Sequence, residues 1–357
     1  MIKYGVLTLL FIAGSHLVKA QGTSPVNMTT TAVPFLRINP DTRGGGMGEL
    51  GIATTPDAGS GLYNLAKTPF ATAPSAAVVN YTPWLRDIVQ GMYLLQASGY
   101  HRLDTFQAVS SSVRYFSLGD VAVSDLSGNH LQTSQPREYA LDLGYSRRLS
   151  GSVALALAMR YIHSRLASGY IDGTNYQAGN AFAADVSLFY KNNKGFSGGL
   201  ALSNLGNKIG YTSDADQKNY LPANLGIGIA YNFVFNDQNK LLLGVDGNKL
   251  LVPASPTDSA SMKAYYSYTI ANSWIRSFNN SGYGFSAGVE YNYADLLFLR
   301  TGYFYEDNTR GGLHYLTAGV GIRYGVFGLN FSYLAPSGYG YHRNPLANTF
   351  RFGLLIN

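Results

Sequence analysis

The sequence has no cysteine, few charged residues and no long apolar run beyond its first two dozen positions. Without cysteine, the chain has no disulfide, thiolate metal site or cysteine nucleophile. Asp, Glu, Lys and Arg make up 13% of its 357 residues, against about 25% in soluble globular domains, and a water-exposed surface so short of charge is hard to keep soluble. A membrane-spanning helix needs about 20 consecutive apolar residues, so a helical membrane protein is also excluded.

Apolar and aromatic residues are abundant but dispersed: 46% of the chain is hydrophobic and 13% is aromatic, and it contains 41 glycines. Disordered chains are poor in aromatic residues. The composition favours an all-β chain whose strands have one apolar and one polar face, as in a transmembrane β-barrel. The net charge of +6 comes from scattered residues with no basic run that could follow a phosphate backbone, so we expect no nucleic-acid partner.

The first 20 residues have the order of a secretory signal peptide. Lys3 precedes an apolar stretch, and Val18-Lys19-Ala20 supplies a small residue at the expected cleavage site. Export, β pattern and low charge together predict an outer-membrane protein in contact with lipid. We expect three parts: a signal peptide at 1–20, an N-terminal extension at 21–74 and a barrel at 75–357.

From Ser75 onward, apolar and small or polar side chains alternate with the period of two that is typical of a β-strand. Leu155 and Leu157 share one face, for example, while Ala156 and Ala158 share the other. We expect the apolar face to meet lipid and the other face to line an antiparallel transmembrane barrel. The pattern predicts about 14 strands, at 76–82, 91–103, 106–118, 137–148, 152–165, 180–191, 196–205, 223–235, 240–248, 282–293, 295–306, 313–324, 326–334 and 348–356.

The connections between these strands alternate in length. Short ones, such as 148–151 and 236–239, carry Gly, Asn or Asp where turns favour them. The intervening ones, such as 119–136 and 249–281, are mostly longer. Because bacterial outer-membrane barrels have short periplasmic turns and long outer loops, this parity predicts that both mature termini lie in the periplasm.

Residues 21–74 do not follow the strand pattern. Their glycine-rich run at 44–48 lets the backbone bend sharply or approach a wall closely. In a barrel of this size, the natural place for such a segment is the lumen, as a plug or hatch. Residues 46–51 also match the letters of the dinucleotide fingerprint, but no strand precedes them and no βαβ unit follows, so we interpret them as part of the hatch.

Charged residues are predicted on the inner face of the barrel, where they could line a substrate path. Since buried charges must be paired, we favour a network that holds the hatch against the wall. Its candidate members are Arg37, Asp41 and Arg43 of the hatch and Asp142, Glu290 and Arg323 of the wall.

The sequence defines no catalytic, cofactor or metal site. Its six histidines do not pair at metal-ligand spacing, and a catalytic triad could be named only by guessing tertiary contacts. We therefore expect a protein that is not an enzyme and that uses no cofactor or metal ion.

Four aromatic residues in predicted outer loops are candidates for partner contacts. Trp84 follows the first strand, and Tyr265, Tyr266 and Trp274 lie in the longest connection, 249–281. Trp and Tyr are prominent in binding hot spots, but they also form the aromatic girdle of outer-membrane barrels. The sequence leaves both interpretations open.

Four stretches carry a resemblance to a known family: Asn-Pro-Asp-Thr-Arg-Gly-Gly-Gly-Met-Gly at 39–48, Ala-Thr-Thr-Pro-Asp-Ala at 53–58, Tyr-Thr-Pro-Trp-Leu at 81–85 and Arg-Tyr-Phe-Ser-Leu-Gly-Asp at 114–120. They resemble the PorV (LptO) family of type IX secretion outer-membrane barrels, which is related to the FadL transporters of hydrophobic solutes. The chain departs from the family pattern at Gly44, where Ala is common, and at Leu65, where Pro is common.

The resemblance implies a FadL-like barrel with a non-enzymatic role. It implies that the protein accepts secreted proteins from a large translocon barrel through their C-terminal signal domains. It further implies delivery of those proteins to a surface attachment complex that contains a sortase-like peptidase. The alternative function is a FadL-like channel for the uptake of hydrophobic small molecules.

Overall fold

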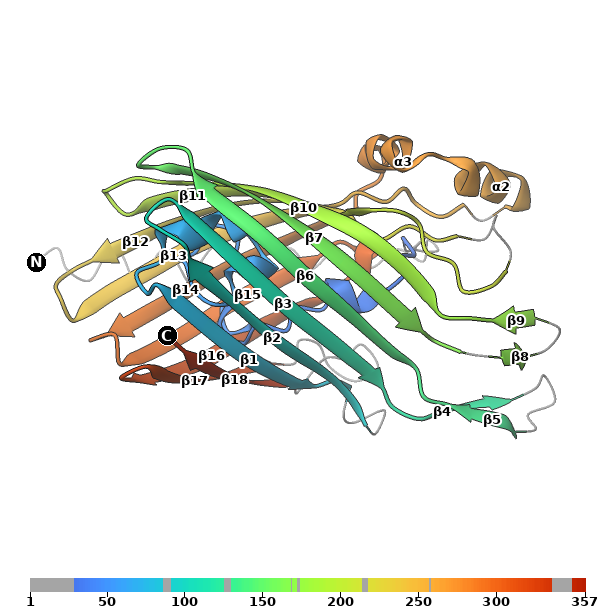
Figure 1. Ribbon diagram of the computed structural model, residues 1–357, viewed down its shortest axis with the longest axis horizontal. Coiled ribbons are helices and arrows are strands. Elements are labelled where there is room, and N and C mark those ends of the chain that lie inside the picture. Colours follow the sequence, from blue (N-terminus) through green and yellow to red (C-terminus); the bar gives the residue numbers. More distant parts are fainter. Residues whose placement is uncertain are drawn as a thin grey trace, which may run out of the picture.

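The computed structural model describes residues 29–85, 91–124, 130–167, 169–171, 174–213, 218–256, 258–335 and 349–357. These residues form a closed antiparallel barrel of 14 strands, in which the last strand pairs with the first (Figure 1). The wall strands are β1 (Ser75–Pro83), β2 (Met92–Arg102), β3 (Gln107–Leu118), β6 (Arg137–Arg148), β7 (Val153–Arg165), β10 (Gly179–Lys191), β11 (Phe196–Gly206), β12 (Asn224–Val234), β13 (Asn239–Leu250), β14 (Tyr283–Tyr293), β15 (Leu297–Glu306), β16 (His314–Tyr324), β17 (Phe327–Ala335) and β18 (Phe350–Ile356).

The predicted strand pattern is confirmed, and every wall strand begins and ends within about two residues of the expected range. Closure is made by the antiparallel pairing of β1 with β18, in which Val79 lies opposite Leu354. The barrel thus leaves no unpaired sheet edge in the membrane, where unsatisfied backbone groups are costly.

The two faces of the wall differ as the alternation predicts. On β7, Leu157 and Met159 are 56% and 71% exposed, whereas Ala156 and Arg160 on the opposite face are buried. The outer face is the apolar band that meets lipid. Among the described residues, no helix is both long and apolar enough to cross a membrane.

The long connections carry structure that the sequence did not predict. Two hairpins, β4 (Val121–Ser124) with β5 (His130–Ser134) and β8 (Gly169–Ile171) with β9 (Thr174–Tyr176), extend beyond the wall. The connection after β13 contains α2 (Ser259–Ser267), α3 (Ile270–Arg276) and η4 (Ser277–Asn279), and a short η5 (Asn308–Arg310) follows β15. The helices and both hairpins lie at the same end of the barrel, which we call the long-loop end (Figure 1).

Residues 29–74, which we call the lumenal segment, lie inside the barrel. Their short helices are η1 (Pro34–Arg37), α1 (Thr42–Gly45), η2 (Ser60–Leu62) and η3 (Leu65–Phe70). The α1 helix contacts β16, β17 and β18, while η3 contacts β6, β7 and β10 on the other side of the barrel. The segment therefore spans the lumen from wall to wall.

Glycines on the wall make room for this segment. A Cβ atom at Gly288 would lie 2.3 Å from the carbonyl oxygen of Met47, and one at Gly302 would lie 2.2 Å from its carbonyl carbon. Any larger residue at either position would push the segment away from β14 and β15. The small residues of the inner face thus let the segment's backbone approach the wall directly.

The lumenal segment runs along the length of the barrel. Near its start, the amide of Thr29 donates a hydrogen bond to the carbonyl of Thr309, and the amide of Ala32 donates to that of Tyr220, both in long connections. The segment then reaches the opposite, short-turn end, where β1 begins and β18 ends. The described part of the chain therefore starts at the long-loop end, and the shared periplasmic location of both mature termini stays a prediction. The signal peptide and residues 21–28 lie outside the described residues.

Candidate functional site

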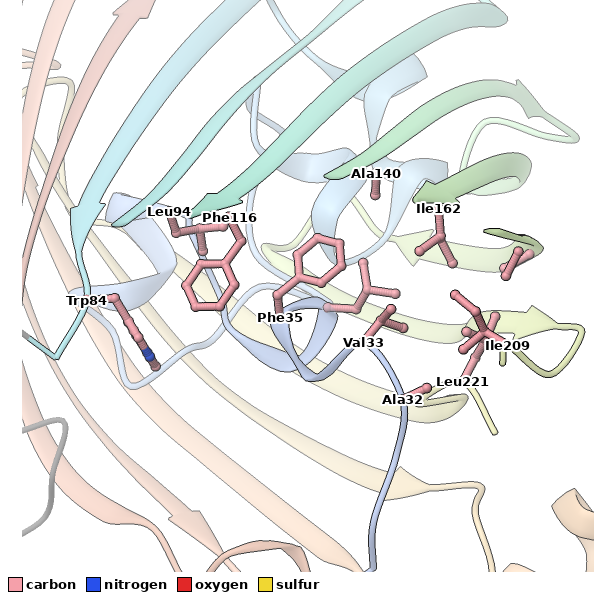
Figure 2. Packing of buried hydrophobic residues seen from close by; sticks show 13 residues of the cluster. Ala32, Val33, Phe35, Trp84, Leu94, Phe116, Ala140, Ile162, Ile209 and Leu221 are labelled. Carbon is pink, nitrogen blue, oxygen red and sulfur yellow. The ribbon is translucent and has the colours of Figure 1, made fainter. Parts of the chain in front are cut away.

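The long-loop end of the lumen is filled by apolar side chains of the segment itself. Val33 and Phe35 have no exposed surface, and the Phe35 ring stacks on Phe116 of β3 with centroids 6.3 Å apart. The two segment residues belong to a cluster that also contains residues of the wall and of the long connections (Figure 2). The cluster comprises Ala32, Val33, Phe35, Leu36, Trp84, Leu94, Phe116, Ala140, Ile162, Ala181, Ala183, Ile209 and Leu221.

Trp84 belongs to this cluster, although it lies in the connection after β1, as predicted. Its side chain is only 8% exposed, and it packs inside the barrel mouth rather than on the surface. The position directly after β1 turns the indole inward. In this conformation Trp84 stabilises the packing of the segment and offers no surface to a partner.

Arg37 pairs with the wall, as the lumenal-network hypothesis expects of a segment residue. Its guanidinium donates to a Glu306 carboxylate oxygen at 2.9 Å and to the carbonyl oxygen of Arg310 at 2.7 Å. Arg310 shares the same carboxylate at 3.0 Å. The partner is therefore Glu306, at the end of β15, which was not among the predicted wall residues.

Arg43 is the centre of the strongest contact between segment and wall. It donates two hydrogen bonds to the Glu290 carboxylate, at 2.7 and 2.9 Å, and one to Asp57 of its own segment at 2.7 Å. Arg300 donates to the same Glu290 at 2.7 Å. Burial alone would lower the pKa of Arg43, but Glu290 and Asp57 raise it well above its usual value. Arg43 and Glu290, both named as candidates for the lumenal network, thus pair with each other and join α1 to β14.

Asp41 has a different role from the predicted ion pair. Its carboxylate accepts hydrogen bonds from the amides of Arg43 and Gly44, so it caps the N-terminus of α1. Among the described residues it forms no ion pair with a wall cation. Burial and the nearby Asp57 raise the pKa of Asp41, while the helix amides lower it. Asp41 thus fixes the local turn that presents Arg43.

Asp142 also differs from the prediction, because it pairs within the wall. Arg160 of β7 lies between Asp142 of β6 and Asp185 of β10, at 2.9 Å from the latter. Arg114 of β3 approaches Asp142 to 4.0 Å. This group braces four neighbouring strands across their inner face and does not involve a charged residue of the segment.

Arg323 is the predicted network member that joins no network. Among the described residues its side chain forms no ion pair, and its buried Nε atom has no hydrogen-bond partner. Its guanidinium lies over the Phe298 ring, 5.3 Å from the centroid. The physical reason is position: Arg323 lies near the short-turn end, where its amide donates to the carbonyl of Leu296 in a short turn, whereas Glu290 lies opposite Arg300, further into the barrel.

Two further contacts of the segment were missed by the sequence reasoning. Arg351 of β18 donates to Glu49 at 2.8 Å, and Asp246 of β13 accepts hydrogen bonds from the amides of Gly51 and Ile52 at 2.8 and 2.9 Å. A signal for the first was available, because Arg351 alternates with the lipid-facing phenylalanines of the last strand. The run at 46–51 is therefore fixed against the wall, in agreement with its interpretation as a hatch segment.

The aromatic residues in the long connection after β13 differ in their exposure to solvent. Tyr265 is buried and packs edge-on against Tyr220, with centroids 5.2 Å apart, so it is a packing residue and not an exposed anchor. Tyr266 and Trp274 are half-buried. The most exposed apolar side chains of the connection are Ile275 and Phe278, at 70% and 57%. These two residues, which the sequence reasoning did not single out, form what we call the α3 apolar tip.

Comparison with known proteins adds a family and a fold. The sequence profile described as "Type IX secretion system protein PorV" matches residues 21–258. No curated protein sequence matches the chain.

Solved structures with a similar barrel include the toluene transporter TbuX of Ralstonia pickettii, at 13% identity and a TM-score of 0.53, covering 89% of this chain and 97% of that one. The toluene transporter TodX of Pseudomonas putida matches at 12% identity and a TM-score of 0.52, covering 87% and 95%. A FadL homologue of Pseudomonas aeruginosa matches at 11% identity and a TM-score of 0.47, covering 88% and 97%. At these identities the likeness to the two toluene transporters shows the fold alone.

Proposed function

Because this chain belongs to the PorV family of type IX secretion system proteins, we propose that it accepts secreted proteins from the translocon and delivers them to the surface attachment complex. Recognition would use the C-terminal signal domain of each secreted protein. The observation that carries the proposal is the family match over residues 21–258, which includes the lumenal segment and the first strands of the barrel. The role is non-enzymatic and needs no cofactor.

The protein is an outer-membrane barrel, and its orientation is part of the proposal. We place the short turns in the periplasm and the long-loop end at the cell surface, as in other bacterial barrels. An epitope inserted near Asn193 or Gln238 should then be hidden in intact cells, and one near Ser259 should be accessible. Equal labelling of both sets would contradict this orientation.

The filled lumen supports the secretion role over the uptake alternative. An uptake channel for hydrophobic molecules, as suggested by the fold it shares with toluene transporters, needs an apolar chamber that is open to its solute. Here the apolar space below the long loops holds Val33, Phe35 and Leu36 of the chain itself. Uptake would first require these three side chains to leave.

The α3 apolar tip supports a partner surface at the long-loop end. Ile275 and Phe278 stand on the connection that rises above the barrel wall (Figure 1). Trp274 directly precedes Ile275 in α3, and Trp is enriched in binding hot spots. Trp274 and Tyr266 remain predicted contributors to this surface.

Affinity purification from native outer membranes tests the proposal. The unaltered protein should recover secreted proteins and a large translocon barrel. Ile275→Ser with Phe278→Ser should reduce that recovery, by about 1 kcal/mol or more in binding per hot-spot residue. Tyr170→Ser is the matched control, because Tyr170 is 77% exposed on the separate β8–β9 hairpin.

Heat-modifiable migration of the same samples reports barrel folding. If recovery falls only in step with the amount of folded barrel, the residues anchor the loop and not a partner. If the unaltered protein recovers neither secreted proteins nor a translocon barrel, the secretion role is wrong. Saturable uptake of toluene-like solutes by the unaltered protein would favour the alternative.

A further inference from the structure

A polar cavity of about 230 Å³ lies between the lumenal segment and the wall near the short-turn end. It is far larger than the roughly 10–15 Å³ that a single water molecule needs. Residues of the segment, among them Arg43 and Asp57, line one side, and Arg300 and Arg323 line the other. Lys240 and Asp295 form an ion pair of 2.8 Å at its edge, next to the short turns.

Almost all charged groups around this cavity already have partners. Arg43 donates to Glu290, Asp57 and Thr55, and Arg300 donates to Glu290 and Asn330. Those two guanidinium groups are therefore occupied by the contacts that hold the segment. The carboxylates that line the cavity are paired as well. Asp57, Glu290 and Asp295 pair with cations, and Asp41 accepts hydrogen bonds from backbone amides.

Arg323 is the exception. Within the described ranges no carboxylate or carbonyl accepts a hydrogen bond from its guanidinium, and its Nε atom is buried without a partner. The guanidinium is held in place by the Phe298 ring, 5.3 Å from its carbon atom. Asn232, which also lines the cavity, has a side-chain amide without a partner among these residues.

We propose that the cavity binds a small oxyanion, a carboxylate or a phosphate, on the guanidinium of Arg323. The planar guanidinium can donate two parallel hydrogen bonds to either anion, and a pair of this kind is stronger than a bond between neutral groups. The Phe298 ring packs against the guanidinium and limits its movement. A buried donor with no acceptor is unfavourable, so an anion in this position would satisfy it.

Isothermal titration of the full chain in detergent, in a buffer free of other oxyanions, tests this proposal with inorganic phosphate and with acetate. The unaltered protein should bind at least one of them saturably. Arg323→Gln should weaken that binding about tenfold or more, because it removes the charge and the paired donors. Arg137→Gln is the matched control, since Arg137 is exposed at the opposite end of the wall. The affinity of this variant for the anion should equal that of the unaltered protein.

Arg323→Lys provides a second variant if the Gln variant does not fold by heat-modifiable migration. It keeps the charge but loses the planar fork, so its affinity should fall several-fold and stay above that of the Gln variant. No saturable binding of either anion to the unaltered protein would overturn the proposal. Equal affinity in the unaltered protein and in the Gln or Lys variant would overturn it as well.

Two sources share this chemistry: a free anion and the carboxyl terminus of a protein chain. A tripeptide with a free carboxylate and the same peptide with an amidated terminus distinguish them. Tighter binding of the free peptide than of acetate, with no binding of the amidated form, assigns the site to a chain end. Equal binding of acetate and free peptide assigns it to free anions.

Discussion

Two arginine-centred networks inside the barrel use the same chemistry in different places. Arg160 and both of its carboxylate partners belong to the wall strands β6, β7 and β10. Arg43 belongs to the lumenal segment and takes one carboxylate from the wall, at Glu290, and one from its own segment. The first network connects wall strands to one another, whereas the second fixes the lumenal segment against the wall.

The networks also differ in how their carboxylates are shared. Glu290 has a second cation, Arg300, at 2.7 Å, and Asp57 has the Ser60 hydroxyl at 3.1 Å and the nearby charge of Lys67. Asp142 and Asp185 depend mainly on Arg160, with Arg114 at 4.0 Å from Asp142. Losing the central arginine therefore leaves less uncompensated charge in the segment network than in the wall network.

The largest effect is expected for Arg160→Ala. It leaves Asp185 without a cation and Asp142 with only Arg114, at 4.0 Å, which costs about 3–5 kcal/mol of folding free energy. Urea titrations followed by heat-modifiable migration measure this loss. Replacing Arg114, Arg160, Asp142 and Asp185 together by apolar residues should restore most of it, because no charge of the group then stays unpaired. A quadruple variant as unstable as the single one would contradict the network.

A smaller effect is expected for Arg43→Ala. Arg300 still neutralises Glu290, and Asp57 keeps the Ser60 hydroxyl and the nearby charge of Lys67, so the loss is that of charge-assisted hydrogen bonds, about 1–3 kcal/mol. It should appear as faster proteolysis within residues 29–74 and as a lower temperature for the loss of heat-modifiable migration. Arg43→Lys keeps the charge, so its proteolysis rate and transition temperature should lie between those of the unaltered protein and of the Ala variant. Unchanged protection of the segment in the Ala variant would count against a docked segment.

The smallest effect is expected from pH and concerns only the segment network. Lys67 is buried beside that network, and burial lowers its pKa to about 8, against 10.5 in an ordinary lysine. The folded state then binds fewer protons than the unfolded state, so stability rises as the pH increases. Between about pH 7 and pH 9 the gain should be about 1 kcal/mol.

Protease protection of residues 29–74 as a function of pH measures this gain. Lys67→Met should abolish the increase, whereas Arg160→Ala should leave its slope intact, because Arg160 belongs to the other network. An increase of the same size in the Lys67→Met variant would show that another group titrates.

The wall of this protein was predictable because its signals are local. The period of two gave the strand positions and their lipid-facing sides, and Gly, Asn and Asp marked the short turns. The partner-contact candidates were harder to predict, because burial in a loop depends on what the loop packs against. Tyr265 and Ile275 lie ten positions apart in one connection, yet the first is buried against Tyr220 and the second is 70% exposed.

The amino-acid sequence by itself determined the barrel: its strand number, its apolar outer face, its charged inner face and the presence of an extra segment before the wall. Only the tertiary structure decided how the inner charges pair. Asp142 and Glu290 have the same local signature, a carboxylate on the small-residue face of a strand. Arg43 meets Glu290 from 247 positions away, because the closed wall and the path of the segment bring them together. No local pattern encodes that distance, so the same pattern predicted a segment contact for Asp142, which pairs within the wall.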